Sequence, residues 1–568
     1  KCLRACLDYF GEDSREYELL ERGIVLHHGK MPGSLGRLLV RAIRERVVNL
    51  VIATSTLSEG VNLPFETVLI PSLRRATSSI SAREFGNLTG RAGRPGYGTE
   101  GRSLVLLPQT FGDDQHRDQV ARAKQRYAGI VDQMRQSPIS DAQVRAVSPL
   151  AVLLSHVNTL WQRVSGTISD HGFIEWLERT APIELDLSQS DKDHKNLIAA
   201  LDTLDGVVLS TIVELERLSQ QKLNANEMED ELRRIWQHTY ARFASAEEQR
   251  LREHYMLRGN ALRNRIYPEQ THRRRLYRTG LAPRDGSKLI EVYPALREHL
   301  ENGFTYTSWS AESQFNYIRD TVTKLSVVQQ FKPEEKAGRT PVDWRKVLRW
   351  WLDPENAPVT PSRKQVSDWH DFVSKSFIYK LNWGLGSVIA LAFDQVYQGA
   401  IHSPNLQDWP NTGLPWITFW IKELVTWGTL DPVVAQLLTY NLAACRDDAR
   451  TMSQKYYISR TGVDANEMLN AMAIKRWIDE HLASSSVASR EGPPPNMQVS
   501  LQRDFSSTSN SRWRVLPIDV GGKIQWIDPA GYILGESDRI DGWQSVWLDD
   551  YDFFLDSERR VVEHQPYI

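Results

Sequence analysis

The first 110 residues alternate between helix-like and strand-like spacings of apolar side chains. Apolar positions three and four apart predict helices over residues 3–10 and 32–46. Short apolar runs occur at residues 23–28, 47–53, 67–70 and 103–107, and the last three predict strands buried on both faces. Strands that alternate with helices indicate a parallel sheet with helices on both faces. Functional loops in such a sheet follow the carboxyl ends of the strands.

The rest of the chain changes character twice. Helical spacing dominates from about residue 115 to 480, and short strand-like runs follow at residues 513–518, 522–527 and 532–534. We therefore expect six segments. They are an α/β lobe (1–110), a helical or winged-helix-like connector (111–230), an arginine-rich helical domain (231–353), a tryptophan-rich helical domain (364–483), a linker (484–499) and a small β-containing domain with an acidic tail (500–568).

Composition limits the possible classes of protein. Apolar residues make up 41% of the 568 residues and charged residues 25%, as is usual for a soluble globular protein. The net charge of −2 means that any nucleic-acid-binding surface must be local. Three cysteines exclude a disulfide framework and a four-cysteine zinc site. No apolar run is long enough to span a bilayer, so we expect no membrane segment. The small number of cysteines fits a cytoplasmic protein, and we expect no metal site in this chain.

Two motifs carry the candidate chemistry. The first, VIATSTLSEGVNLP at residues 51–64, follows a predicted strand, and the hydroxyl groups of Thr54 and Thr56 suit contact with phosphates. The second, NLTGRAGRPGYGTEG at residues 87–101, places Arg91 and Arg94 three residues apart among glycines. Planar guanidinium groups with small neighbours suit close contact with a polyphosphate.

In this order and spacing, the two motifs resemble motifs V and VI of superfamily 2 helicases. Their residues are most similar to those of the Ski2-like branch. The resemblance covers about residues 20–108 and implies that the lobe is a second RecA-like lobe, incomplete at its start. It implies that Arg91 and Arg94 act as arginine fingers on the γ-phosphate of ATP. It also implies an ATP-facing group made of Glu59, Gly60, Asn62, Asn87 and Gly90.

The resemblance further implies that Thr54 and Thr56 contact the nucleic-acid backbone. His28 lies in a His-His-Gly string similar to the segment that opens the second helicase lobe, where we expect a structural or backbone-contacting role. Asn87 departs from the family, which usually has Gln or His at this position. Asn is one methylene shorter, which leaves its contact with phosphate or water open.

A complete motor also needs a GxxxxGK(S/T) phosphate loop and a DExH-type box, and the chain contains neither. We therefore expect the first lobe, with its Mg²⁺ ligands, to lie in the same longer polypeptide or in a partner subunit. Together the two lobes would bind ATP and Mg²⁺. This chain alone should not hydrolyse ATP.

Two further regions have alternative interpretations. Residues 231–280 contain 12 arginines and 5 acidic residues with interleaved aromatics, and the density is highest at Arg273, Arg274 and Arg275. Such a segment suits the binding of single-stranded nucleic acid, but a solvated helix packed through its aromatic face fits as well.

Tryptophans are frequent in residues 350–427, where core packing is favoured over a base-stacking platform.

Three functions remain open on these observations. The first is the C-terminal part of an ATP-dependent helicase or translocase acting on DNA or RNA, with bacterial genome maintenance or anti-phage defence as its setting. The second is a non-catalytic scaffold built on a degenerate lobe, against which the presence of both Arg91 and Arg94 argues. The third, a nuclease or deaminase domain, has no acidic cluster or HxE…CxxC signature to support it.

Overall fold

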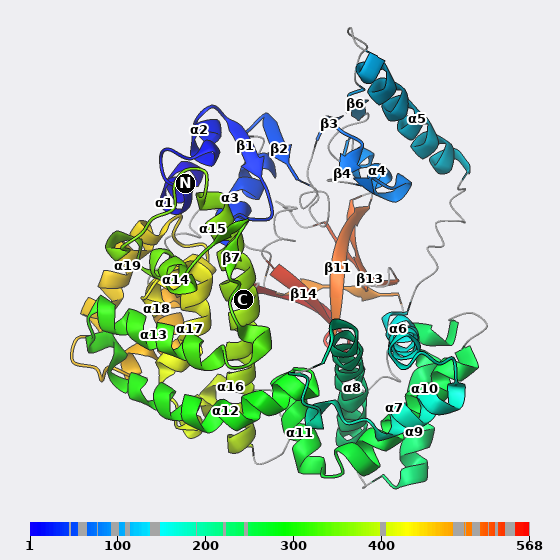
Figure 1. Cartoon of the computed structure of the whole chain (residues 1–568). Coiled ribbons are helices and arrows are strands. Elements are labelled where there is room, and N and C mark those ends of the chain that lie inside the picture. Colours follow the sequence, from blue (N-terminus) through cyan, green and yellow to red (C-terminus); the bar gives the residue numbers. More distant parts are fainter. Residues whose placement is uncertain are drawn as a thin grey trace. The chain divides into compact units, whose positions relative to one another are not determined.

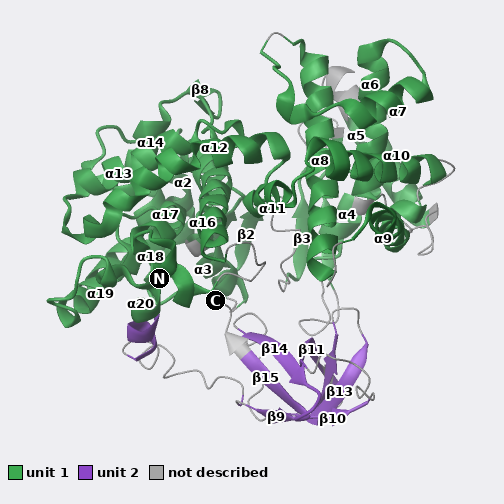
Figure 2. Cartoon of the chain, turned by 90° about the horizontal axis from the view of Figure 1, so that it is seen from below, with its two compact units in different colours: residues 1–474 green, residues 475–568 purple. Residues whose placement is uncertain are grey.

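The structure is a computed structural model that describes most of the chain. The described residues are 1–44, 47–54, 65–75, 78–92, 101–107, 114–136, 148–188, 190–219, 223–243, 248–397, 405–480, 494, 496–502, 512–520, 522–528, 532–539 and 551–566. They form two compact units, Lys1–Ile474 and Lys475–Ile568 (Figure 2). The chain is mostly helical and has strands near its C-terminus, as the apolar spacing predicted; the structure adds that these strands form an antiparallel sheet (Figure 1).

The chain begins with a small α/β segment. Its elements are α1 (Cys2–Phe10), α2 (Arg15–Glu21), β1 (Ile24–His27), α3 (Gly33–Arg44) and β2 (Leu50–Ala53). Strands β1 and β2 pair in parallel, and α1 buries its apolar face against its neighbours. The predicted helices at residues 3–10 and 32–46 and the strand within residues 47–53 are confirmed.

A second strand pair follows. It contains β3 (Thr67–Ile70), β4 (Arg74–Arg75), β5 (Ser78–Ser79), α4 (Ala82–Thr89), β6 (Arg102–Val105) and α5 (Asp114–Gln136). Strands β3 and β6 pair in parallel, which confirms the predicted strands at residues 67–70 and 103–107. A small core of Ile70, Leu73, Ile80, Phe85 and Ile130 joins the strands to α4 and α5.

The expected single RecA-like parallel sheet with helices on both faces is not evident among the described residues. They contain only two separate two-stranded parallel sheets in this region. Parallel sheets are normally covered on both faces. A sheet of two four-residue strands is too small to be covered in this way. Leu50, Ile52, Leu69 and Leu104 accordingly remain about half exposed.

A helical body is built around the long helix α8. It comprises α6 (Pro149–Ser165), α7 (Asp170–Arg179), η2 (Pro182–Glu184), α8 (Lys192–Leu218), α9 (Ala225–His238), η3 (Tyr240–Phe243), α10 (Glu248–Ala261), η4 (Leu262–Ile266), α11 (Gln270–Thr279) and α12 (Pro283–Glu301). Side chains of Ser148, Asp191 and Asn224 accept backbone hydrogen bonds at the starts of α6, α8 and α9, as helix N-caps do. Leucine and valine side chains of α8 form the centre of the core.

A tryptophan-rich helical region follows. Its elements are η5 (Asn302–Ser308), α13 (Ala311–Leu325), η6 (Gln329–Phe331), β7 (Lys336–Ala337), β8 (Thr340–Pro341), α14 (Trp344–Leu352), η7 (Pro354–Asn356), α15 (Val366–Phe372), η8 (Val373–Leu381), α16 (Asn382–Val396), η9 (Leu406–Thr412), α17 (Trp416–Trp427), α18 (Pro432–Thr439), α19 (Arg446–Ser459), η10 (Glu467–Leu469) and α20 (Ala471–Ile478). The side chains of Trp351, Trp409, Trp416 and Trp420 are buried. The core-packing interpretation is therefore confirmed for these tryptophans, whereas Trp383 is 38% exposed.

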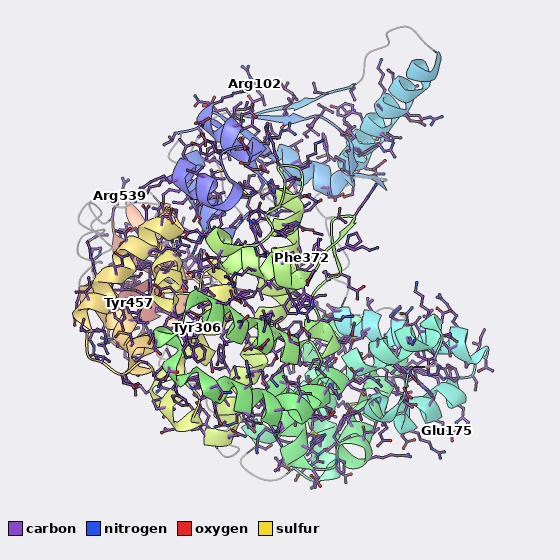
Figure 3. The ribbon with its side chains drawn as sticks, turned by 60° about the vertical axis from the view of Figure 1, so that its left-hand side comes forward. Arg102, Glu175, Tyr306, Phe372, Tyr457 and Arg539 are labelled. Atoms are coloured by element: carbon purple, nitrogen blue, oxygen red, sulfur yellow. The ribbon has the colours of Figure 1, made fainter. Side chains whose placement is uncertain are left out.

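Several polar atoms within this core have specific hydrogen-bond partners, whereas the indole N–H groups of Trp409 and Trp427 have none among the described residues. The indole N–H of Trp351 donates to the Val425 carbonyl oxygen at 2.6 Å. The hydroxyl of Tyr306 donates to the Leu430 carbonyl oxygen at 2.9 Å, and that of Tyr457 donates to the Asp431 carboxylate at 2.7 Å; both tyrosines are labelled in Figure 3. Pairing of this kind offsets the desolvation cost of burying a polar group.

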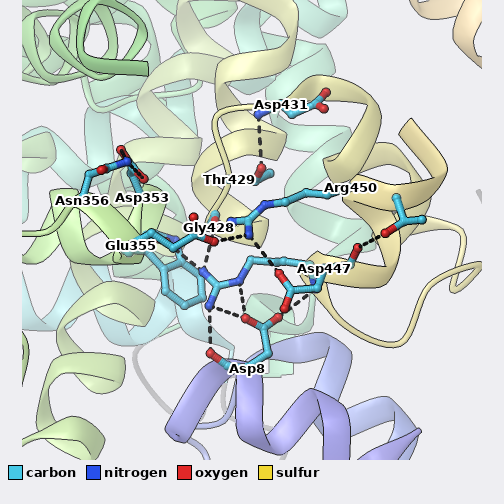
Figure 4. A network of polar contacts seen from close by, with 12 residues as sticks. Asp8, Asp353, Glu355, Asn356, Gly428, Thr429, Asp431, Asp447 and Arg450 are labelled. Atoms are coloured by element: carbon cyan, nitrogen blue, oxygen red, sulfur yellow. Dashed lines mark hydrogen bonds and ion pairs between the residues drawn. The ribbon is translucent and has the colours of Figure 1, made fainter. Parts of the chain in front are cut away.

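The tryptophan-rich region docks on the first helix of the chain. Arg446, at the start of α19, holds the Asp8 carboxylate of α1 through its backbone N–H and its guanidinium at 2.8 Å each. The same guanidinium donates to the carbonyl oxygens of Trp351 and Gly428 (Figure 4). Exposed ion pairs lie around this centre: Lys30 with Asp368, Arg363 with Glu18 and Arg4 with Asp448.

Two helical stretches are long and apolar enough to cross a membrane by composition alone, Lys192–Leu218 and Val366–Val396. In each, 56% of the most apolar window is buried inside the protein. Core helices of soluble proteins have the same composition, so these stretches are weak indicators of a membrane segment.

The C-terminal unit contains a seven-stranded sheet. Its strands are β9 (Met497–Gln498), β10 (Ser500–Leu501), β11 (Arg512–Val520), β12 (Lys523–Ile527), β13 (Ile533–Asp538), β14 (Tyr551–Asp556) and β15 (Val561–Pro566). The order is β10-β13-β12-β11-β14-β15-β9, and every pairing is antiparallel. The segment interpreted as an acidic tail supplies β14, which pairs directly with β11 and buries Phe553 and Leu555.

Candidate nucleotide and nucleic-acid interface

Two of the predicted nucleic-acid contacts emerge from the same edge of a sheet. His27 and Ala53, the last residues of β1 and β2, are partners in the parallel register. The next residues, His28 and Thr54, therefore follow neighbouring carboxyl ends, which is where parallel sheets carry their functional loops. The backbone N–H of Thr54 donates to the His27 carbonyl oxygen at 3.2 Å, and the Thr54 side chain is exposed.

The His28 ring is fixed from both sides. The backbone N–H of Lys30 donates to Nδ1 at 3.3 Å, so the ring proton lies on Nε2, which donates to the Glu16 carboxylate at 3.2 Å. Burial favours a raised pKa of Glu16, but hydrogen bonds from His28 and the backbone outweigh it and lower that pKa. Both ring nitrogens are engaged and the side chain is mostly buried, so the expected contact of His28 through its backbone stays a prediction.

Three residues of the second motif lie at the end of α4. The side chain of Asn87 is exposed on the last turn, Gly90 ends the helix, and Arg91 follows with its backbone N–H bonded to the Leu88 carbonyl oxygen at 3.2 Å. A Cβ atom at Gly90 would stand 3.1 Å from the Gly86 carbonyl oxygen, a tight contact that a glycine avoids. The Arg91 side chain is half-buried.

The remaining motif residues lie outside the described part of the chain. They are Thr56, Glu59, Gly60, Asn62 and Arg94. Their assigned roles stay predictions. The structure thus brings His28 and Thr54 together at the β1–β2 pair. Asn87, Gly90 and Arg91 lie at the end of α4, in the segment that contains the β3–β6 pair.

The predicted basic cluster on α11 is mostly engaged within the protein. Arg273 is buried; its guanidinium donates to the carbonyl oxygens of Tyr267 and Pro268 at 2.6 and 2.8 Å and to the Glu216 carboxylate. Arg274 lies 3.5 Å from Asp394. Only Arg275 of the three presents an exposed side chain, so a strand contact from this cluster stays a prediction for Arg275.

Much of the arginine-rich segment is likewise engaged in contacts within the protein. Ion pairs join Arg258 to Asp205, Arg263 to Glu216 and Arg278 to Asp394. The acidic partners come from α8 and α16, outside the window in which the local charge was counted. Three of the interleaved aromatics, Trp236, Tyr255 and Tyr267, are buried in the core. Local charge therefore overstates the basic surface of this segment.

Within the residues that the structure describes, no group of three His, Cys, Asp or Glu side chains is placed to hold a metal ion. Mg²⁺ ligands were expected in the first lobe rather than here.

Comparison with known proteins identifies relatives of one part of the chain. No family model matches. The chain is 38% identical over 104 residues to the Hachiman protein HamB of Bacillus cereus, 34% over 94 residues to the ATP-dependent DNA helicase Hel308 of Thermoplasma acidophilum, and 34% over 92 residues to the antiviral helicase SKI2 of Saccharomyces cerevisiae.

These matches are partial on both sides. They cover 18%, 16% and 16% of this chain and only 9%, 14% and 7% of the three relatives. The activities of those whole proteins therefore do not transfer directly. Over a segment of about 100 residues, this chain is homologous to Ski2-like helicases.

Proposed function

We propose that this chain is the C-terminal part of an ATP-dependent nucleic-acid helicase or translocase. The observation that carries the proposal is the parallel register of β1 and β2, which puts His28 and Thr54 at one sheet edge. The helicase-like string that begins on β2 continues from this edge. Relatives at more than 30% identity are named as helicases, which supports the same assignment.

In this proposal the ATP site is shared between two lobes. Arg91 and Arg94 approach the γ-phosphate from the second lobe, while the first lobe provides the phosphate loop and the ligands of Mg²⁺. The half-exposed apolar side chains of Leu50, Ile52 and Leu104 support a lobe that is completed by further layers. ATP binding at Glu59, Gly60 and Asn62 belongs to the proposal.

The biological process in which this activity takes place also belongs to the proposal. One relative is named an antiviral helicase and another a DNA helicase. Both names fit a role in bacterial genome maintenance or anti-phage defence, with DNA or RNA as the track.

The alternative is a non-catalytic scaffold that binds nucleic acid or protein. The observation in its favour is the buried pairing of Asp8 on α1 with Arg446 on α19, a contact between distant segments that has no catalytic chemistry. Against it stands the presence of Arg91 and Arg94 together with Gly60 and Asn62, because a drifted lobe has no need for all four.

The test is an ATPase assay on the chain joined to the first lobe encoded upstream or supplied by its partner. We expect turnover that single-stranded nucleic acid stimulates, and we expect Arg94→Ala to lower it by about 10³- to 10⁵-fold with nucleic-acid binding retained. Arg102→Ala, an exposed arginine at the start of β6 (Figure 3), is the matched control and should leave turnover unchanged. Normal turnover of Arg94→Ala contradicts the finger role, and absence of stimulated turnover in the joined protein favours the scaffold.

A further inference from the structure

The turn η3, directly after α9, holds two aromatic side chains out of the protein. Tyr240 is 67% exposed and Phe243 is 69% exposed, whereas Ala241 between them is completely buried. The buried Ala241 pins the turn against the helical body, with α6, α9 and α10 as neighbours. The turn is therefore held at Ala241 while the rings of Tyr240 and Phe243 lie at the surface.

Hydrogen bonds make this turn rigid. The backbone N–H of Thr239 donates to the Trp236 carbonyl oxygen at 3.0 Å, and that of Ala241 donates to the Thr239 hydroxyl at 3.2 Å. Beneath the turn, the buried indole of Trp236 donates to the Glu248 carboxylate at 2.7 Å. The two exposed rings are therefore presented on a preorganised support, which lowers the entropic cost of binding a ligand on them.

Arg242 adds a positive charge to this surface. Its guanidinium carbon lies 4.5 Å from the centroid of the Phe243 ring, and its Nη1 donates to the Gln237 carbonyl oxygen at 3.0 Å. It makes no ion pair with any carboxylate of the described residues, unlike Arg233 and Arg234 on the preceding helix, which pair with Glu229 and Glu231. Arg242 thus keeps its charge available to a phosphate.

Exposed aromatic rings beside an unpaired cation are the combination that holds single-stranded nucleic acid, because bases stack on the rings while the cation meets the phosphate. We propose that Tyr240, Arg242 and Phe243, here named the η3 platform, bind a single strand of nucleic acid by stacking bases on the two rings. This inference rests on the proposed nucleic-acid function and names a contact site for it. It moves the main strand contact of the arginine-rich segment away from the buried Arg273.

A second exposed aromatic pair provides a matched control. Tyr379 and Trp383 on η8 and α16 stand edge to face with ring centroids 6.2 Å apart. The lysines of the same helical stretch are neutralised, because Lys375 and Lys380 pair with Asp371 and Glu334. This pair therefore has exposed rings without an available cation.

The experiment measures fluorescence anisotropy of a labelled single-stranded oligothymidine, and of the matching oligouridine, titrated with the full chain. We expect the double substitution Tyr240→Ala, Phe243→Ala to weaken binding by at least tenfold, since each base–aromatic stack contributes roughly 5- to 100-fold. Tyr240→Phe should bind like the wild type. Arg242→Ala should reduce the slope of log Kd against log salt by about 0.7, the value for one phosphate on a single strand.

The control and the readouts separate the possible results. The side chains of the η3 platform are exposed, so circular dichroism and the thermal midpoint should be unchanged in its variants; Trp383 is only 38% exposed, so the control variant is compared by circular dichroism at a temperature where it is folded. Wild-type affinity in the Tyr240→Ala, Phe243→Ala variant, alongside binding by the wild type, overturns the η3 platform and leaves the proposed function standing. An equal loss in the Tyr379→Ala, Trp383→Ala control overturns the specific site in favour of general aromatic contact. Absence of binding by the wild-type chain overturns the platform and the nucleic-acid function together.

Discussion

Arg446 and Asp8 form a buried ion pair between positions 438 residues apart in the chain. Their side chains are only 4% and 12% exposed, and the two charged groups approach to 2.7 Å. The guanidinium also lies over the Tyr9 ring, 4.8 Å from its centroid. One arginine of the tryptophan-rich region therefore anchors the first helix of the α/β segment.

Replacing Arg446 with Ala should destabilise the first unit. The substitution leaves the Asp8 carboxylate buried without its partner, and breaking such a pair costs about 3–5 kcal/mol. Urea denaturation followed by tryptophan fluorescence measures the change. Arg4→Ala, which removes an exposed pair with Asp448, is the control and should cost less than about 1 kcal/mol; equal losses in the two variants would contradict a special role of the buried pair.

The pair of Arg258 and Asp205 makes a second test. Both side chains are fully buried, and Arg258 holds both carboxylate oxygens at 2.6 Å. Asp205→Ala leaves a buried guanidinium and should cost about 3–5 kcal/mol, whereas the double variant Asp205→Leu, Arg258→Met should recover most of that loss. Thermal and urea unfolding measure both. A double variant as unstable as the single one would show that packing, rather than unpaired charge, dominates.

Stability should fall as the pH drops below about 6.5 because of His370. Burial lowers the pKa of His370 to about 4, and its Nε2 lies 2.8 Å from the Tyr9 carbonyl oxygen. The unfolded chain binds a proton near pH 6.5, so the folded state, which keeps the ring neutral, loses stability between that pH and about 4. We expect a loss of about 2 kcal/mol from pH 7 to 5.

His370→Gln isolates this contribution, because glutamine keeps a donor for Tyr9 and does not titrate. The difference in unfolding free energy between wild type and variant should shrink by about 2 kcal/mol from pH 7 to 5. Taking the difference cancels the effect of other groups, including Asp202, whose pKa burial raises to about 7. A difference that is constant with pH would show that His370 is accessible to protons when folded.

The α11 arginines should separate into two kinds. Arg275→Ala removes an exposed charge and should leave stability unchanged; if Arg275 meets a phosphate, the salt slope for a single strand falls by about 0.7. Arg273→Ala leaves Glu216 buried without this partner and should cost about 3 kcal/mol. Denaturation and oligonucleotide titrations at several salt concentrations measure the two effects. An unchanged salt slope for Arg275→Ala would show that Arg275 contacts no phosphate and is a solvated surface residue.

Local elements were well predicted wherever apolar spacing was strong. The helix at α1 and the strands β2, β3 and β6 appear within a few residues of their predicted bounds. Strands β14 and β15 were missed, because frequent acidic residues obscured the alternation that buries Phe553 and Leu555. The single parallel sheet is not evident among the described residues, because pairing among strands depends on contacts that spacing along the chain does not contain.

The candidate site was predicted in part. The placement of Thr54 after β2 was correct because chain order alone sets which residues follow a strand. The basic surface was misjudged at Arg273, whose partner Glu216 lies 57 residues away. Exposure at Tyr240 and burial at Trp236 were equally invisible, since both residues are aromatic and only four positions apart.

The sequence by itself determined the local elements and the helicase-like motifs, since both depend on residues close together in the chain. Only the tertiary structure decided which charges are free and which rings are exposed. Arg273 and Arg242 are both arginines of one basic segment, but one is buried against Glu216 while the other stacks on Phe243 at the surface. The physical reason is that desolvation and Coulomb energy depend on neighbours in space, which folding brings together from distant segments.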